Sequence, residues 1–323
     1  MNKPIAIIAG EPNSISSEII FKSWKLRKKY THKPLLVIGS IKLLNLQKKK
    51  LNYRIKIKEI KNKFSLKDLN TNMLSVYDVE YKQTKPFQKI SNKSNRYIFK
   101  CFNIALDLAK SKKILGFINC PVSKETLFKK KQSGVTEFLS KKSGVKDGEV
   151  MLIYNKKLSV SPLTTHIPIN QVSKKINQLK IIKKIKVINN FYRKILNKKP
   201  HIAVLGLNPH NFTSQKSNEE KKIIIPAIKK IKKTGIKITG PISPDTSFVE
   251  YKKNKFDVIF GMYHDQVLAP YKTLFKYNAI NITLGLPFIR VSPDHGTAIN
   301  LVGKKISDPT SLNESVKFFN CLK

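Results

Sequence analysis

The chain has 323 residues, of which 41% are apolar, and its 63 basic and 20 acidic side chains give a formal charge of +43. This length and apolar content support a large folded core and argue against a disordered chain. Only five basic residues are arginines, and the 58 lysines are spread along the whole sequence. Because base recognition favours arginine forks and stacked aromatic rings, we interpret the charge as a solvated surface that attracts anionic small molecules, and not as a nucleic-acid site.

Three cysteines, Cys101, Cys120 and Cys321, form no CxxC pair. Their odd number and their spacing favour a reducing compartment over a disulfide or zinc–thiolate framework. The apolar stretch near the N-terminus is interrupted by Gly10 and Pro12, and no run approaches the roughly 20 apolar residues that span a bilayer. The sequence therefore predicts a cytoplasmic protein with no membrane partner.

Short apolar runs alternate with longer segments of helical periodicity along the chain. Strands are expected at 5–9, 35–38, 114–119, 150–154, 158–161, 202–207, 257–261 and 279–284, and helices at 16–29, 41–49, 95–112, 172–197, 219–233 and 312–322. Residues 54–58 alternate like a half-exposed strand, and the remainder of 50–92 is ambiguous. This alternation predicts an α/β fold with a largely parallel sheet.

Polar clusters follow several of the expected strands. They are found at 119–124, 164–166, 208–210, 263–265 and 294–297, and they contain four of the six histidines, His166, His210, His264 and His295. In open parallel sheets, ligands bind beyond the carboxyl ends of the strands. We therefore expect these distant segments to converge on one site.

His166, His210 and His264 are candidate metal ligands. Three neutral imidazoles bind a divalent transition ion and leave positions open for a substrate. Their separations of 44 and 54 residues carry no local signature such as HExxH, so a hydrogen-bonded structural role is the better interpretation of any one of them alone. Their shared position after strands is what favours a common ligand role. Asp245 and Asp265 are candidates to orient a histidine or to accept a proton, and Asp245 could instead cap a helix or turn.

Lys272, Asn281 and Arg290 form a second candidate group. An ammonium, an amide and a guanidinium together would hold a phosphate, which the arginine could bind in bidentate fashion. Lysine is ordinary in this chain, whereas Arg290 is one of five arginines. Neither GxGxxG, GxxxxGK[ST] nor GxSxG occurs, so the residues alone indicate an α/β enzyme acting on an anionic metabolite, with a metal ion as one option.

Five ordered motifs then point to a known family. LTTHIPI, LGLNPHN, GPISPDTSF, MYHDQVLAPYK and NITLGLPFIRVSPDHGTA resemble the 4-hydroxythreonine-4-phosphate dehydrogenases of pyridoxal phosphate biosynthesis. The order and spacing agree along nearly the whole chain, except for residues 40–92 and the last twenty.

The resemblance implies a two-lobed α/β/α fold similar to isocitrate and isopropylmalate dehydrogenases, with the active site in the cleft between the lobes. We expect residues 1–125 to form the first part of one lobe, 126–255 to form the second lobe, and 256–323 to return to the first. The family binds NAD or NADP without a Rossmann glycine loop, and its members are homodimers whose subunits share the metal ligands.

The resemblance also assigns residues. It implies that His166, His210 and His264 hold one divalent ion (zinc, cobalt or magnesium), and that Thr136, Lys272, Asn281 and Arg290 bind substrate. Asp245 and Asp265 are then the candidate catalytic carboxylates, and Asp294 and His295 the candidate cofactor contacts. The implied reaction is NAD-dependent oxidation of 4-hydroxythreonine 4-phosphate to a β-keto acid, which decarboxylates to 3-amino-2-oxopropyl phosphate.

Some positions depart from the family pattern. Val135 stands where the family usually has a histidine, and Ser123 lies in a loop that usually reads GPVHK or GPINK. These changes leave the three histidines intact but bear on substrate choice. One alternative is therefore a dehydrogenase acting on a 4-phosphorylated threonate or erythronate. A second alternative, raised by the lysine content, is a nucleic-acid binder that has lost activity.

Overall fold

The structure is a computed structural model, and it describes every residue except 1–2, 70, 129–133, 146–147, 212–217 and 323. The chain forms two compact units. The first contains residues 1–138 and 287–323, and the second contains residues 139–286. Within the described residues, no helix is long and apolar enough to cross a membrane.

The first unit is built on six parallel strands in the order β3-β4-β2-β1-β5-β12. The central strands are almost entirely buried and rich in Ile, Leu and Val, as expected for a sheet covered on both faces. The strands are β1 (Ile5–Ile8), β2 (Leu35–Gly39), β3 (Ile57–Ile60), β4 (Leu74–Asp78), β5 (Gly116–Asn119) and β12 (Ile289–Pro293).

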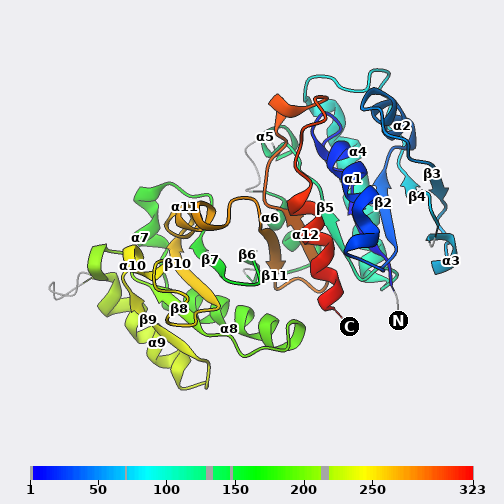
Figure 1. The fold of residues 1–323 in the computed structure, drawn as a ribbon. Coiled ribbons are helices and arrows are strands. Elements are labelled where there is room, and N and C mark those ends of the chain that lie inside the picture. The colour runs from blue at the N-terminus through cyan, green and yellow to red at the C-terminus, as the bar shows by residue number, and fades with distance from the viewer. Residues whose placement is uncertain (1–2, 70, 129–133, 146–147, 212–217, 323) are drawn as a thin grey trace. The chain divides into compact units, whose positions relative to one another are not determined.

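Helices form a layer on each face of this sheet (Figure 1). One layer is the long helix α4 (Asn95–Lys110), which packs on β1, β2 and β5. In the other layer, α1 (Ser16–Leu26) contacts α2 (Ile41–Lys50) and α12 (Thr310–Phe318). The shorter helices of the unit are α3 (Leu66–Leu69), α5 (Lys124–Phe128) and the start of α6 (Val135–Lys142).

The second unit has a mixed sheet in the order β11-β6-β7-β10-β8-β9. β6 is antiparallel to both of its neighbours, whereas β7, β10, β8 and β9 are parallel. The strands are β6 (Val150–Tyr154), β7 (Ser159–Thr164), β8 (Ile202–Leu205), β9 (Ile238–Ile242), β10 (Val258–Tyr263) and β11 (Ile280–Leu284).

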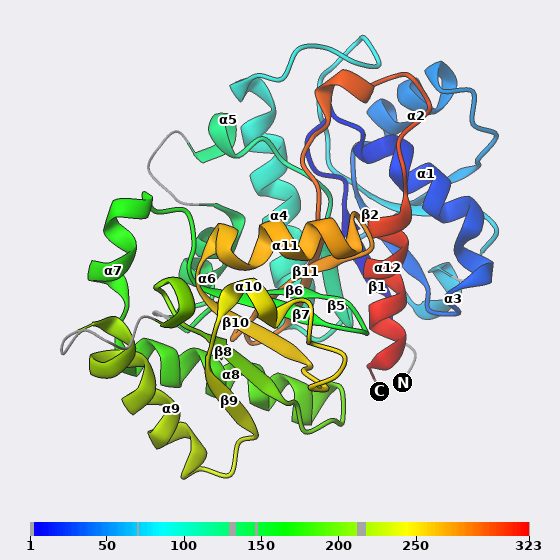
Figure 2. The same ribbon diagram turned by 60° about the vertical axis from the view of Figure 1, so that its left-hand side comes forward.

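Helices also cover this second sheet (Figure 2). α8 (Gln178–Ile195) packs on β6, β7 and β11 and contacts α9 (Ile225–Lys232), and α11 (His264–Phe275) packs on β7 and β10. The short helices are α7 (Val172–Lys175) and α10 (Pro244–Ser247), and one π-helical turn (Glu220–Ile224) precedes α9. The predicted α/β/α class with largely parallel sheets is confirmed.

Strand pairing corrects the expected domain boundaries. Residues 256–286 were expected to return to the first lobe, but β10 pairs with β7 and β8, and β11 pairs with β6, so this segment lies in the second unit. The helix expected at 172–197 is also interrupted, because Ile176 is extended and the Asn177 side chain caps a new helix by accepting from the Leu179 and Lys180 amides.

Candidate functional site

Three of the four predicted strand-end histidines emerge from neighbouring parallel strands of the second unit. His166 follows β7, His264 follows β10 and His210 follows β8, and these strands are adjacent in the order β7-β10-β8. Carboxyl ends of parallel strands meet at one edge of a sheet. The prediction that the histidine clusters follow strands is therefore confirmed for all three.

The His166 and His264 rings lie side by side, with centroids 5.9 Å apart. Pairing of Tyr263 with Thr164 across β10 and β7 sets this placement, and the Thr164 hydroxyl donates to the Met262 carbonyl at 2.8 Å. The sheet register thus brings together two imidazoles that are almost 100 residues apart in sequence.

Asp265 fixes the orientation of His264. Its Oδ1 lies 2.6 Å from His264 Nδ1. Because an ionised carboxylate can only accept, Nδ1 is the donor in this contact, and the neutral ring in this tautomer has its lone pair on Nε2. This carboxylate–imidazole arrangement is the one that orients histidine ligands in metal sites. Both residues lie in the first turn of α11, where a negative charge is favoured by the helix dipole.

His210 forms a separate pair with Asp245. Its Nδ1 lies 3.6 Å from Asp245 Oδ2, and its backbone is left-handed with φ 50° and ψ 23°. The Ser243 hydroxyl, the Thr246 amide and the charge of His210 together hold the pKa of Asp245 below its usual value, with the hydroxyl contributing most. Asp245 lies at the start of α10 and accepts from the Thr246 amide at 2.8 Å, so it also stabilises the turn.

Two buried side chains that the sequence reasoning missed hold these loops in place. Glu220 accepts from the Leu207 and Asn208 amides at 2.8 Å each and from Asn208 Nδ2 at 2.9 Å. Gln266 donates to the Gly206 carbonyl and accepts from the Met262 amide, both at 2.7 Å, and so links the ends of β8 and β10. The sequence offered one sign that Glu220 has a structural role: Glu219 and Glu220 are adjacent in a chain that has only 20 acidic residues.

The second unit therefore carries two half-sites at one edge of its sheet: His166 with His264 and Asp265, and His210 with Asp245. Within the described residues, no three histidine, cysteine, aspartate or glutamate side chains are grouped so as to hold a metal ion. The two adjacent imidazoles are suitable donors for a divalent transition ion.

The candidate phosphate ligand Arg290 lies in β12 of the first unit and is only 3% exposed. Its Nε donates to Asn119 Oδ1 at 2.7 Å, at the end of β5. Burial lowers the pKa of Arg290 to about 10, and the nearby Glu137 acts in the opposite direction. Burial also lowers the pKa of Lys124, on which the nearby charges of Glu137 and Arg290 act in opposite directions. The guanidinium is thus charged at neutral pH and anchored by a partner that the sequence reasoning did not assign.

The remaining candidate substrate residues are divided between the two units. Thr136 is half-buried in the first turn of α6, next to Val135, which is 6% exposed. Lys272 is exposed on α11 and Asn281 is half-buried on β11, both in the second unit.

The candidate cofactor residues Asp294 and His295 follow β12 in the first unit. The Asp294 amide donates to the Ser311 hydroxyl at 2.9 Å, and the nearby Thr297 carbonyl accepts from the Ile15 amide at 3.3 Å. The loop after β1 therefore lies against this segment. In that loop Gly10 has φ +75°, and a Cβ there would come within 2.5 Å of the Pro121 carbonyl oxygen, so only glycine fits.

Fold and site together define a two-unit α/β protein with an imidazole-rich site at the carboxyl ends of parallel strands. The family described as "Pyridoxal phosphate biosynthetic protein PdxA" matches residues 31–319. The chain belongs to this family, which confirms the resemblance seen in its motifs.

Individual relatives agree with this assignment. The chain is 40% identical to a 4-hydroxythreonine-4-phosphate dehydrogenase of Sulfurihydrogenibium sp. (strain YO3AOP1), over 99% of its own length and 98% of the relative's. It is 33% identical to an Oceanobacillus iheyensis protein named "Putative D-threonate 4-phosphate dehydrogenase", with 97% and 96% covered. The crystal structure of 4-hydroxythreonine-4-phosphate dehydrogenase from Klebsiella pneumoniae superposes with a TM-score of 0.84 at 30% identity, covering 99% of this chain and 100% of that one. The relatives are thus named as dehydrogenases, which are oxidoreductases.

Proposed function

We propose that this protein oxidises 4-hydroxythreonine 4-phosphate with NAD or NADP and a divalent metal ion, in pyridoxal phosphate biosynthesis. The product would be a β-keto acid that loses carbon dioxide to give 3-amino-2-oxopropyl phosphate. The observation that carries the proposal is the His166–His264 pair, with ring centroids 5.9 Å apart, in a chain 40% identical to an enzyme of that name.

The donor set supports a metal site completed by a second copy of the chain. His166 and His264 would supply two imidazoles, and the His210 of a partner subunit would supply the third. A closed two-fold dimer offers the same surface from both copies, so each half-site of one subunit can meet the complementary half-site of the other. Homodimerisation is therefore part of the proposal.

The protein's own residues would bind and orient the reactants. Arg290 and Lys272 would neutralise the phosphate, Thr136 and Asn281 would donate or accept hydrogen bonds along the substrate, and Asp294 and His295 would contact the cofactor. Asp265 and Asp245 would hold their histidines in the productive tautomer, and either could receive the hydroxyl proton. When bound, the metal ion would supply Lewis acidity for loss of that proton and for decarboxylation, and the nicotinamide would accept the hydride.

A direct assay tests the proposal: NADH formation from 4-hydroxythreonine 4-phosphate, with and without a chelator. We expect activity in the wild type, its loss on chelation with recovery on adding Zn²⁺, Co²⁺ or Mg²⁺, and a loss of at least 100-fold in His210→Ala, because the third ligand is removed. His201→Gln is the matched control, since His201 lies at the opposite end of β8 and should retain activity. Absence of NADH formation by the metal-loaded wild type would refute the proposal.

A second substrate remains a candidate. D-threonate 4-phosphate lacks the amino group, one relative carries a D-threonate 4-phosphate dehydrogenase name, and Val135 replaces a histidine that the family usually offers. Comparing kcat/KM for the two substrates decides between them: the higher value identifies the substrate for which the site is built.

A further inference from the structure

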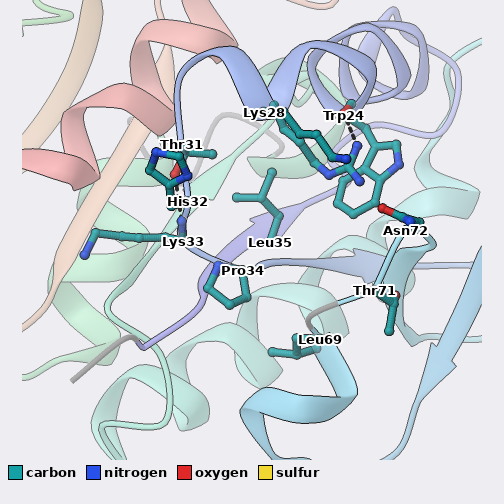
Figure 3. Close-up of a pocket in the computed structure, with 11 residues that line it drawn as sticks. Trp24, Lys28, Thr31, His32, Lys33, Pro34, Leu35, Leu69, Thr71 and Asn72 are labelled. Atoms are coloured by element: carbon teal, nitrogen blue, oxygen red, sulfur yellow. Dashed lines mark hydrogen bonds between the residues drawn. The ribbon is translucent and has the colours of Figure 1, made fainter.

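A pocket of about 470 Å³ opens in the first unit, beside the end of α1 (Figure 3). It is bordered by Lys33, Pro34 and Leu35, where β2 begins. Asn119 is the last residue of β5 and Asp294 follows β12, so both lie at the carboxyl ends of strands in the same parallel sheet. The pocket therefore lies at the opposite edge of that sheet and is distinct from the proposed catalytic residues.

The ionisable side chains that line the pocket are all basic. Its lining includes Arg27, Lys28, His32 and Lys33 but no aspartate or glutamate. Lysines alone mean little in a chain that has 58 of them, but arginine and histidine occur only five and six times. Among the residues that the structure describes, none of these four side chains makes an ion pair. The described lining of the pocket thus gathers basic side chains and contains no carboxylate.

Arg27 is held in place at the rim. Its guanidinium stacks 3.6 Å from the centre of the Trp24 ring, and Nη1 donates to the Trp24 carbonyl at 2.8 Å. Partial burial lowers the pKa of Arg27. A partly desolvated guanidinium that is fixed by stacking loses little side-chain freedom when it binds an anion, and its planar fork matches the oxygens of a phosphate.

The remaining walls suit an organic group. Pro34, Leu35 and Leu69 form an apolar floor, and Thr71 and Asn72 add a hydroxyl and an amide. In Figure 3, His32 and Lys33 lie on one side of Leu35, and Trp24 and Asn72 on the other. The volume falls within the roughly 300–1,000 Å³ of small-molecule sites and exceeds what a lone ion needs.

We propose that this pocket binds a small phosphomonoester, with its phosphate between Arg27 and Lys28 and its organic group over Leu35 and Leu69. The site would be additional to the dehydrogenase site. The inference does not depend on the proposed activity, because it rests only on the lining of the pocket and on its unpaired cations. Occupancy should stabilise the folded protein by mass action.

The chain provides its own reporter of binding. Trp24 is the only tryptophan, so titration of the wild-type protein with phenyl phosphate should give a saturable change in tryptophan emission, matched by heat in calorimetry. Phenol, which lacks the phosphate, should give neither. Phenyl phosphate bound near Arg290 would give heat without a change in Trp24 emission, which separates the two sites.

Variants make the assignment specific. Arg27→Gln and Lys28→Gln should each raise the dissociation constant about tenfold, because each removes one charged phosphate contact. Lys28→Gln is the cleaner variant, since Arg27 also touches Trp24. Lys25→Gln is the matched control, because Lys25 is an exposed lysine near the end of α1 that does not line the pocket. Affinity unchanged in both pocket variants, or a Trp24 signal that never saturates, would overturn the proposal.

Discussion

Arg290 is a buried charge with a side-chain hydrogen bond to Asn119. Its side chain is 3% exposed, and its Nε donates to Asn119 Oδ1 at 2.7 Å. Hydrogen bonds to charged groups contribute roughly 1.5–3 kcal/mol, and a buried donor left without an acceptor costs more than the bond contributed. Asn119 is therefore a positioning residue for the proposed phosphate clamp.

Asn119→Ala should raise KM for the phosphorylated substrate about tenfold or more while changing kcat much less, because phosphate binding is affected and the reacting carbon is not. Steady-state kinetics separate the two constants. Asn119→Asp retains an oxygen acceptor and should stay within a few-fold of wild type. An unchanged KM in a folded Asn119→Ala protein would remove Asn119 from this role.

Glu11 is a second buried ionisable residue in the first unit. It is 1% exposed, and burial raises its pKa above the usual 4.5, despite hydrogen bonds from the Asn13 amide and the Ser94 hydroxyl. Because the folded state holds the proton more tightly than the unfolded chain, this carboxyl contributes stability below about pH 4.5 that is lost as pH rises through its folded-state pKa.

Glu11→Gln should therefore raise the melting temperature at pH 7 relative to wild type, and the difference should shrink towards pH 4. Thermal unfolding at both pH values measures it. Glu80→Gln, at a side chain that is 74% exposed, is the control and should show little difference at either pH. A difference in melting temperature that grows as the pH falls would contradict the direction of the Glu11 pKa shift.

At the scale of elements, the break between α7 and α8 depends on one cap. Asn177 is extended, with φ −146° and ψ 137°, and its side-chain oxygen accepts from the Leu179 and Lys180 amides. The periodicity of this lysine-rich segment continues through the break, so it predicted a single helix. Ile176 is 5% exposed, so its burial in the extended conformation adds to the effect of the cap.

Asn177→Ala should lower the free energy of unfolding by about 0.5–2 kcal/mol, because two amides at the start of α8 lose their acceptor. Urea denaturation followed by far-ultraviolet circular dichroism measures the change. Asn177→Asp retains the capping oxygen and should restore most of the loss. Equal stability of the alanine and aspartate variants would show that the cap contributes nothing.

At the scale of the whole molecule, the two half-sites of the second unit predict active-site sharing between subunits. In the proposed dimer, each site takes His166 and His264 from one subunit and His210 from the other. His210→Ala and His264→Ala therefore remove ligands that different subunits contribute to a site. A mixed dimer of the two then contains one intact site and one doubly damaged site.

Mixing equal amounts of inactive His210→Ala and His264→Ala proteins, after dissociation and reassociation, should restore about a quarter of wild-type activity, because half of the random dimers are mixed and each has one intact site. NADH formation measures it. The matched control is a mixture of His166→Ala with His264→Ala, in which every site lacks a ligand and no activity should return. Recovery in both mixtures, or in neither, would contradict the sharing.

Much of the architecture follows from local patterns. Buried runs such as Leu35–Gly39 predicted their strands, because parallel strands covered on both faces need continuous apolar residues. β4 and the exact place of β3 were not predicted, since only pairing in the sheet separates them from their polar surroundings. The placement of residues 256–286 in the second unit, and not in the first, was likewise decided by the pairing of β10 with β7 and β8.

The sequence by itself determined the fold class, the family and the placing of the histidines after strands, because strand periodicity and ordered motifs are local properties of the chain. Only the tertiary structure decided which side chains meet. Strand order and register bring His166 to His264, turn His210 towards Asp245, and set Asn119 against the buried Arg290. The burial that fixes the charge of such groups and the hydrogen bonds that fix their orientation arise between segments distant in sequence, and no local pattern encodes them.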